Sequence, residues 1–201
     1  MKKGLLIVLS GPSGAGKGTV YNAVTACCPM LKKSISVTTR KPRNGEQEGV
    51  HYYFRTVEEY RKMKANGEFL ETAEVYKNFY GTPQAPVFRM LEEGNDVFFE
   101  IDIAGAKQIK QKYPECVSVF LMPPSFAVLE QRLRGRGTED EESLATRIGS
   151  ARSELAQYAC FDYIVFNDDA QAATKQVIEI IAAERCKISR NEQTILKMLE
   201  K

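Results

Sequence analysis

Short apolar runs alternate with helical patterns along most of the chain. Four runs bounded by turn residues predict buried strands at 5–9, 96–102, 117–122 and 162–168. Because these runs are apolar at nearly every position, we expect strands that are covered on both faces, as in a parallel sheet. Apolar positions at helical spacing predict helices at 17–28, 105–113, 125–133 and 170–187. This alternation indicates an α/β fold with helices on both faces of a parallel sheet.

Two stretches interrupt the alternation. Residues 34 to about 82 carry strand patterns, turn signals at Asn44-Gly45 and Lys77-Asn78, and a short helix whose capping box begins at Thr56. They predict an insertion with its own small sheet. Residues 132–155 are dense in charge, and a second capping box, beginning at Thr138, predicts that a helix restarts there. This second stretch resembles a mobile helical cover more than core.

Composition places the chain among ordinary globular proteins. Its 201 residues favour one main domain, and a net charge of +2 gives no reason to expect a nucleic-acid or membrane partner. The five cysteines form no CxxC pair and His51 is the only histidine, so neither a disulfide framework nor a zinc site is expected. No run approaches about 18 apolar residues, the length of a membrane span. We therefore expect a soluble, cytoplasmic protein.

The stretch "GPSGAGKGT" follows the first predicted strand and opens the first predicted helix, which is the context of a phosphate-binding loop. Its glycines allow successive N–H groups to point inward, and the lysine can reach the β- and γ-phosphates of a nucleotide. One position departs from the usual motif, because glycine stands where Ser or Thr normally contacts Mg²⁺. Mg²⁺ would then be held mainly through nucleotide phosphates and water. In order, the loop residues are Gly11, Pro12, Ser13, Gly14, Ala15, Gly16, Lys17, Gly18 and Thr19.

Two groups of arginines lie outside this loop. Arg40 and Arg43 fall within "TTRKPR" in the insertion, and Arg132, Arg136 and Arg147 fall in the charged cover. Arginine binds phosphate through two parallel hydrogen bonds, although each group taken alone could equally be a solvated face. Two cationic sites facing one phosphate loop indicate two phosphate-bearing substrates, a donor and an acceptor. That arrangement favours a kinase over a nucleotide hydrolase.

Seven motifs occur in the order and spacing of guanylate kinases, and the chain resembles that family over nearly its whole length. They are "LSGPSGAGKGT", "SVTTRKPRNGE", "GVHYYF", "EFLE", "FYGTP", "EIDIAGAKQIK" and "LRGRGTEDEESLATRI". The resemblance implies a nucleoside monophosphate kinase fold that transfers the γ-phosphate of ATP to GMP with Mg²⁺. It implies a core of residues 1–33, 83–125 and 156–201, a GMP-binding insertion at 34–82 and a lid at 126–155.

The resemblance also implies a role for each matching residue. Lys17 and the loop would hold the ATP phosphates, with Asn167 near the adenine. The GMP phosphate would contact Arg40, Arg43, Tyr52 and Tyr80, and the guanine would lie among Ser36, Glu71, Thr82 and Asp102. Arg132, Arg136 and Arg147 would lie near the transferring phosphoryl group. Lys17, Arg40 and these three lid arginines form the expected catalytic set.

The chemistry of guanine supports the assignment of Glu71. Guanine presents two donors, N1–H and the exocyclic amine, whereas adenine presents an acceptor at N1, so a carboxylate favours guanine. Two alternatives stay open: another nucleoside monophosphate kinase, such as an adenylate kinase, and a guanylate-kinase-like interaction module that has lost catalysis. Retention of Lys17, Arg136 and Arg147 weighs against the second. The oligomeric state and the choice between GMP and dGMP are open.

Overall fold

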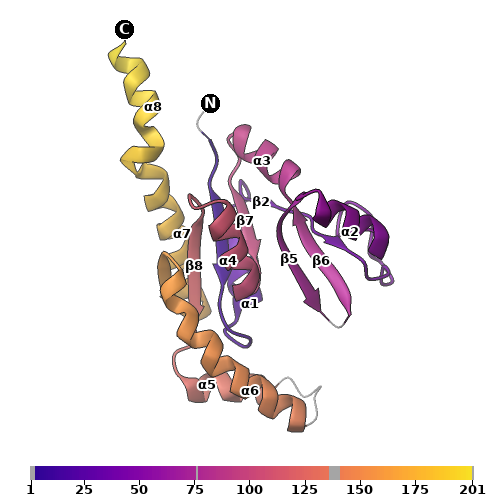
Figure 1. The fold of residues 1–201 in the computed structure, drawn as a ribbon. Coiled ribbons are helices and arrows are strands. Elements are labelled where there is room, and N and C mark those ends of the chain that lie inside the picture. The colour runs from indigo at the N-terminus through magenta and orange to yellow at the C-terminus, as the bar shows by residue number, and fades with distance from the viewer. Residues whose placement is uncertain (1–2, 76, 136–140, 201) are drawn as a thin grey trace.

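A five-stranded parallel sheet forms the centre of the molecule. The computed structural model describes residues 3–75, 77–135 and 141–200, with no account of the side chains of 141–147. The strands run in the order β2-β7-β1-β8-β9, and every pair is parallel. Their carboxyl ends all lie at one end of the sheet (Figure 1). The strands are β1 (Leu6–Ser10), β2 (Lys32–Lys33), β7 (Val97–Glu100), β8 (Val117–Met122) and β9 (Tyr163–Phe166).

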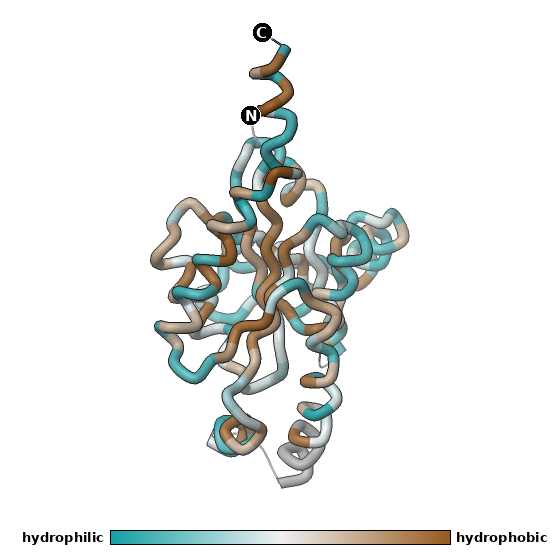
Figure 2. The backbone as a smooth tube through the Cα atoms, turned by 90° about the vertical axis from the view of Figure 1, so that its left-hand side faces the viewer, coloured by the Kyte–Doolittle hydropathy of each residue, from teal (hydrophilic) through white to brown (hydrophobic). Residues whose placement is uncertain are grey.

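Strand β1 shows why the sheet is covered on both faces. Successive side chains of a strand point to opposite faces, so Ile7 and Leu9 face one layer of helices and Leu6 and Val8 face the other. The first layer contains α1 (Lys17–Cys27) and α7 (Ala170–Cys186), and the second contains α3 (Gln84–Glu92) and α4 (Ile103–Lys112). Figure 2 shows the apolar strands at the centre of the molecule. The α/β architecture predicted from the sequence is confirmed.

A second, smaller sheet lies beside this core. Its strands run in the order β4 (Tyr53–Phe54), β3 (Val37–Thr38), β6 (Asn78–Pro83) and β5 (Phe69–Val75). Helix α2 (Val57–Ala65) covers it, with Tyr60 buried between two phenylalanine rings, and the predicted capping box at its start is present. The side chain of Gln108 on α4 bonds both the N–H and the C=O of Thr72 on β5. These bonds attach the small sheet to the core.

The 3₁₀ turn η1 (Ala156–Cys160) joins α6 (Glu141–Leu155) to the start of β9. Helix α5 (Phe126–Arg134) and the first part of α6 lie beyond the carboxyl ends of the central strands (Figure 1). They pack together through Leu129, Leu133 and Ala151. Helix α6 begins at Glu141, and Thr138, from the predicted capping box, lies outside the described residues. The limits proposed for the core, insertion and lid stay predictions.

Sequence patterns missed three elements. Strand β2 consists of two exposed lysines, which carry no strand signal. Helix α3 begins after Pro83 without a side-chain cap, so the usual start signal is missing. Helix α8 (Ile188–Leu199) projects from the body at the amino ends of the strands (Figure 1). It has no buried residue, and its exposed apolar side chains are Ile188, Ile195, Leu196, Met198 and Leu199.

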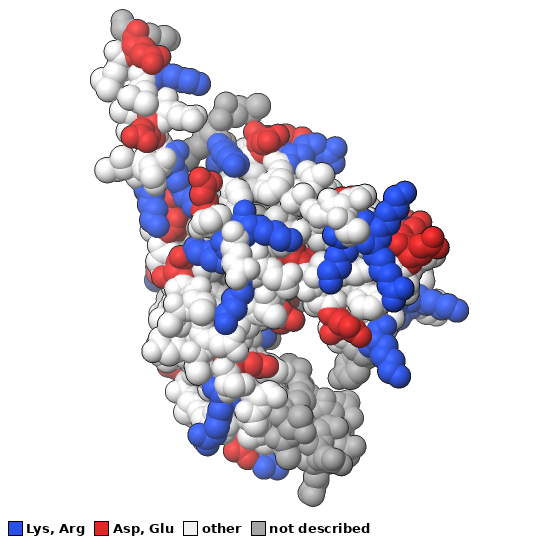
Figure 3. All heavy atoms as spheres, viewed as in Figure 1, with Lys and Arg blue, Asp and Glu red and all other residues white. Residues whose placement is uncertain are grey.

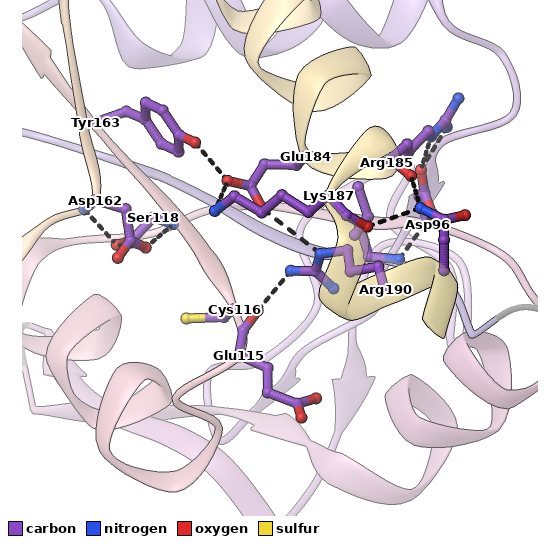
Figure 4. A network of polar contacts seen from close by, with 12 residues as sticks. Asp96, Glu115, Cys116, Ser118, Asp162, Tyr163, Glu184, Arg185, Lys187 and Arg190 are labelled. Carbon is purple, nitrogen blue, oxygen red and sulfur yellow. Dashed lines mark hydrogen bonds and ion pairs between the residues drawn. The ribbon is translucent and has the colours of Figure 1, made fainter. Parts of the chain in front are cut away.

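A buried glutamate joins α7 and α8 to the sheet, as Figure 4 shows. The carboxylate of Glu184, 2% exposed, accepts a hydrogen bond from the Tyr163 hydroxyl and pairs with Lys187 at 2.5 Å and Arg190 at 3.5 Å. Burial alone would raise the pKa of Glu184, but the bonds from Lys187 and Tyr163 outweigh it and hold the pKa below its usual value. This network therefore favours the ionised carboxylate in the folded protein.

Replacing Glu184 with glutamine should lower the free energy of unfolding at pH 7 by about 1–3 kcal/mol, because the bonds that Lys187, Arg190 and Tyr163 make to this buried side chain would lose its negative charge. The ionised carboxylate contributes above the ordinary glutamate pKa, and its contribution is lost as the pH falls through the lowered pKa. The difference between wild type and Glu184→Gln, measured by urea unfolding, should therefore shrink from pH 7 to pH 3. Glu179→Gln, on an exposed part of the same helix, is the matched control, and an equal loss there would contradict this account.

Candidate functional site

The loop from Gly11 to Thr19 leaves β1 and enters α1 in a conformation that requires its glycines. Gly11, Gly14 and Gly16 have φ values of 147°, 84° and 89°, which favour glycine. Close packing adds a second requirement. A Cβ at Gly11 would lie 2.4 Å from the carbonyl oxygen of Leu121, and one at Gly16 would lie 2.5 Å from Nδ2 of Asn167. The loop is thus held against β8 and the end of β9.

The N-terminus of α1 is arranged as an anion site. Gly16 caps the helix without a side-chain hydrogen bond, so α1 presents N–H groups and the positive end of its dipole to the loop. The Lys17 ammonium donates to the carbonyls of Gly11 (2.7 Å) and Pro12 (3.0 Å), which places it over the loop. The Ser13 N–H donates to the carboxylate of Glu154 on α6 (3.0 Å). No sequence pattern pointed to Glu154.

Asn167 lies against this loop, and Arg132 contacts Asn167. The buried Asn167 amide donates to the Ala15 carbonyl at 2.7 Å, and Nη2 of Arg132 donates to the Asn167 carbonyl at 3.1 Å. Nη1 of Arg132 is buried and has no hydrogen-bond partner in the described part of the chain. A buried guanidinium nitrogen without a partner is costly, so it indicates space for an anion. Arg136 lies outside the described residues, and Arg147 belongs to α6, where its side chain is not described.

Glu100 ends β7 beside the position at which the usual metal-binding hydroxyl is missing. A Cβ at Gly18 would lie 3.4 Å from Oε1 of Glu100, and the carboxylate is accessible to solvent. Partial burial raises the pKa of Glu100, and the positive charges of Lys17 and Lys33 oppose that rise. Carboxylate oxygen is a preferred ligand of Mg²⁺, directly or through water. Among the residues that the structure describes, no three acidic, His or Cys side chains group closely enough to hold a metal by themselves.

The small sheet brings together three of the residues predicted for the acceptor phosphate. The Arg40 guanidinium lies over the Tyr52 ring at 5.4 Å from its centroid, and the Tyr52 and Tyr80 rings are 6.0 Å apart. Arg40 also makes two bonds to Glu46, of 2.9 and 2.8 Å, and Glu46 accepts from the Arg43 N–H at 2.6 Å. The Arg40 bonds, then the Arg43 amide, lower the pKa of Glu46 to about 2.

Sequence reasoning overlooked Glu46, although the turn at Asn44-Gly45 could have predicted that residue 46 returns toward residue 40. Arg43 itself is exposed, with its backbone rather than its side chain tied to Glu46. Ser36 contributes its carbonyl to the Tyr53 N–H at 2.9 Å and is half-buried at the edge of this sheet.

An acidic pair, the buried Glu71 and the exposed Asp102, lies where the small sheet meets the start of α4. Glu71, 6% exposed, accepts a 2.6 Å bond from the Thr82 hydroxyl, and Asp102 caps α4 by accepting from the Gly105 N–H at 2.7 Å. A Cβ at Gly105 would lie 3.2 Å from an oxygen of each carboxylate, so the glycine leaves room between them. Burial and, to a smaller extent, the charge of Asp102 raise the pKa of Glu71, and the Thr82 bond opposes this.

The residues predicted to bind GMP can be placed relative to one another and to the phosphate loop. Tyr80 and Thr82 are two residues apart on β6, so both point to the same face at a spacing of about 7 Å. Asp102 follows β7, whose last residue pairs with Leu9 just before the phosphate loop. The acidic pair is therefore one strand away from that loop. Figure 3 shows acidic and basic side chains interspersed over this view.

Two further hollows lie at the other end of the sheet, away from the loop. One is lined by residues such as Asp96 and Arg185, and the other lies between α8 and the start of β8. Both have mixed charge and contain none of the predicted site residues. No helix among the described residues is long and apolar enough to cross a membrane.

Comparisons with known proteins agree with this geometry. The guanylate kinase family model matches residues 3–184. Guanylate kinases of Carboxydothermus hydrogenoformans and Caldanaerobacter subterraneus are 50% and 49% identical, over 98% and 99% of this chain and 96% and 97% of theirs. The crystal structure of guanylate kinase from Anaplasma phagocytophilum has a TM-score of 0.73 and 34% identity, covering 94% of this chain and 90% of that one.

These matches cover the phosphate loop, the small sheet and the helices beyond the strands, and they support neither of the two alternatives considered from the sequence. The fold is that of a nucleoside monophosphate kinase. The chain belongs to the guanylate kinase family, and it catalyses the ATP-dependent phosphorylation of GMP to GDP.

Proposed function

We propose that the phosphate loop holds the donor ATP while the small sheet holds the acceptor GMP, with transfer between them beneath α5 and α6. The observation that carries this proposal is the buried Glu71 carboxylate, which lies beside Thr82 and Asp102 and one strand from the loop. The two donors of a guanine edge match the carboxylate, and a GMP phosphate would then lie toward Tyr80, Tyr52 and Arg40. Thr82 and Tyr80 share one face of β6, which fits an extended nucleotide.

Catalysis in this proposal comes from position and charge. An ionised GMP phosphate oxygen is already a nucleophile, so no general base is needed, and the protein offsets charge on the equatorial oxygens. Lys17, Arg132, Arg136 and Arg147 would supply that positive charge on the donor side. On the acceptor side, Arg40 would bind phosphate while sharing or exchanging its contact with Glu46. Closure of the helices would exclude water.

The donor set around Gly18 fits Mg²⁺. Glu100 would hold the ion through water beside the ATP phosphates, and Gly18 leaves the space that a side chain would fill. The ion, when bound, offsets phosphate charge. We also propose a cytoplasmic enzyme, because all five cysteines are free thiols. GMP and dGMP both fit the proposal, since no contact to the sugar enters it.

Lys17→Ala should reduce kcat by about 100-fold to 1,000-fold, since it removes a positioned charge from the transferring phosphate. Lys17 is half-buried at the start of α1 and lies outside the apolar core, so the circular dichroism spectrum and melting temperature should stay near those of wild type. Release of ADP in a coupled assay measures the effect. Activity within a factor of a few of wild type would remove the loop lysine from the mechanism.

Glu71→Gln should lower kcat/KM for GMP by tenfold or more and reduce the preference for GMP over AMP. The reason is that guanine would lose a hydrogen bond to a charged acceptor. KM for ATP should hardly change. The pKa of Glu71 is raised. On acidification, the wild-type KM for GMP should therefore begin to rise at a higher pH than it would with an ordinary glutamate. The ratio of the KM of the variant to that of wild type should shrink in the same pH range.

Initial rates with GMP and AMP between pH 5 and pH 8 measure both effects. Glu68→Gln, an exposed neighbour bonded to Asn66, controls for the loss of one negative charge. An unchanged substrate preference in Glu71→Gln would count against the guanine pocket.

Glu100→Gln should raise the Mg²⁺ concentration for half-maximal activity by about tenfold to 100-fold, as loss of an outer ligand typically does. Affinity of Mn²⁺ for the ATP complex, measured by electron paramagnetic resonance, should fall by a similar factor. Excess Mg²⁺ should restore much of kcat. If both Mg²⁺ dependence and Mn²⁺ affinity match those of the exposed control Glu93→Gln, Glu100 takes no part in holding the ion.

A further inference from the structure

Glu154 stands out because it is an acidic residue bonded to a loop suited to anions. Its carboxylate accepts from the Ser13 N–H at 3.0 Å, across 141 residues of sequence. Backbone N–H groups of such a loop are the groups that bind phosphate oxygens. A carboxylate oxygen in this place makes the same kind of charge-assisted bond that a phosphate oxygen makes.

The contact lies where α5 and α6 both meet the loop. Ser13 precedes Gly14, and a Cβ at Gly14 would lie 2.9 Å from Leu129 and 3.1 Å from Leu133 on α5. Helix α6 packs on the same two leucines through Ala151, one turn before Glu154. Arg152 lies over the Phe126 ring at 4.2 Å and joins the two helices a second time. The end of α6 is therefore anchored to the loop at Ser13 and to α5 beside it.

ATP brings several negative charges to this loop, and like charges at hydrogen-bond range repel each other. The Glu154 carboxylate and a phosphate oxygen cannot both accept the same Ser13 N–H along one direction. We propose that Glu154 is a positioning residue that competes with the ATP phosphates for the loop: it holds Ser13 in the nucleotide-free protein and is displaced when ATP binds. The inference rests on the proposed ATP site.

Two consequences follow from this exchange. Part of the free energy of ATP binding is used to break the Glu154 contact, so the contact weakens the apparent affinity for ATP. Occupancy of the loop also releases the last turn of α6 from Ser13, which links ATP binding to the position of that helix. A residue that merely supported the loop would have the opposite effect, because its removal would weaken ATP binding.

Calorimetric titration of the full chain with β,γ-imido-ATP tests whether removal of the Glu154 carboxylate tightens or weakens nucleotide binding. Glu154→Ala should tighten binding by about threefold to tenfold, within the range of one charge-assisted bond at a partly exposed site. Glu154→Gln keeps an acceptor oxygen and the shape of the side chain but loses the charge, so it should tighten binding less. Glu130→Gln removes a charge from α5 in a pair with Arg134, away from the loop, and should bind as wild type.

A second measurement follows the Ser13 amide itself. In the nucleotide-free protein, hydrogen exchange at Ser13 should be faster in Glu154→Ala than in wild type, and the analogue should slow it in both. Unchanged or weaker analogue binding in both Glu154 variants would overturn the inference. Loss of ATP binding in Lys17→Ala, with unchanged binding in the Glu154 variants, would refute only the competition, whereas normal binding in Lys17→Ala would refute the proposed ATP site.

Discussion

Close packing around the glycines of the phosphate loop is the constraint on which the arrangement of this enzyme depends. Gly11 lies against the backbone of β8, Gly16 against Asn167 after β9, and Gly14 against two leucines of α5. None of these contacts leaves room for a side chain. Because three separate segments converge on one loop, the loop holds a fixed relation to the sheet and to the helices beyond it. Arg132 bonds the carbonyl of Asn167 beside these contacts, and its Nη1 has no hydrogen-bond partner among the residues that the structure describes.

Burial also determines the electrostatics on the acceptor side. Glu71 is buried, so its carboxylate accepts a hydrogen bond from Thr82, and it lies close to a second acid at Asp102. A ligand that presents two hydrogen-bond donors and no negative charge at that edge would supply the buried carboxylate with the partners that it loses when water is excluded. Gly18 leaves space beside Glu100. A larger residue at this position would approach Glu100 and occupy the space in which we place hydrated Mg²⁺.

The sequence correctly predicted those elements that depend on a local pattern of residues. Buried apolar runs gave the four longer core strands, and the capping box at Thr56 gave the start of α2. Motif resemblance named Glu71, Thr82 and Asp102, which the structure brings together. The long-range contact between Glu154 and Ser13 had no signal near either residue. The pairing of Arg40 with Glu46 had a local signal in the turn at Asn44-Gly45, which was overlooked. Strand β2 was missed because pairing with β7, rather than its own residues, makes it a strand.

We place the donor phosphates and the acceptor base in two sites one strand apart at the carboxyl end of the sheet. A crystal structure of the protein with GMP and β,γ-imido-ATP would locate both ligands. We expect guanine N1 and its exocyclic amine within hydrogen-bond distance, about 2.7–3.2 Å, of the Glu71 carboxylate, and Lys17 Nζ at the ATP phosphates. A guanine bound away from Glu71, or ATP phosphates bound away from Lys17, would contradict this placement.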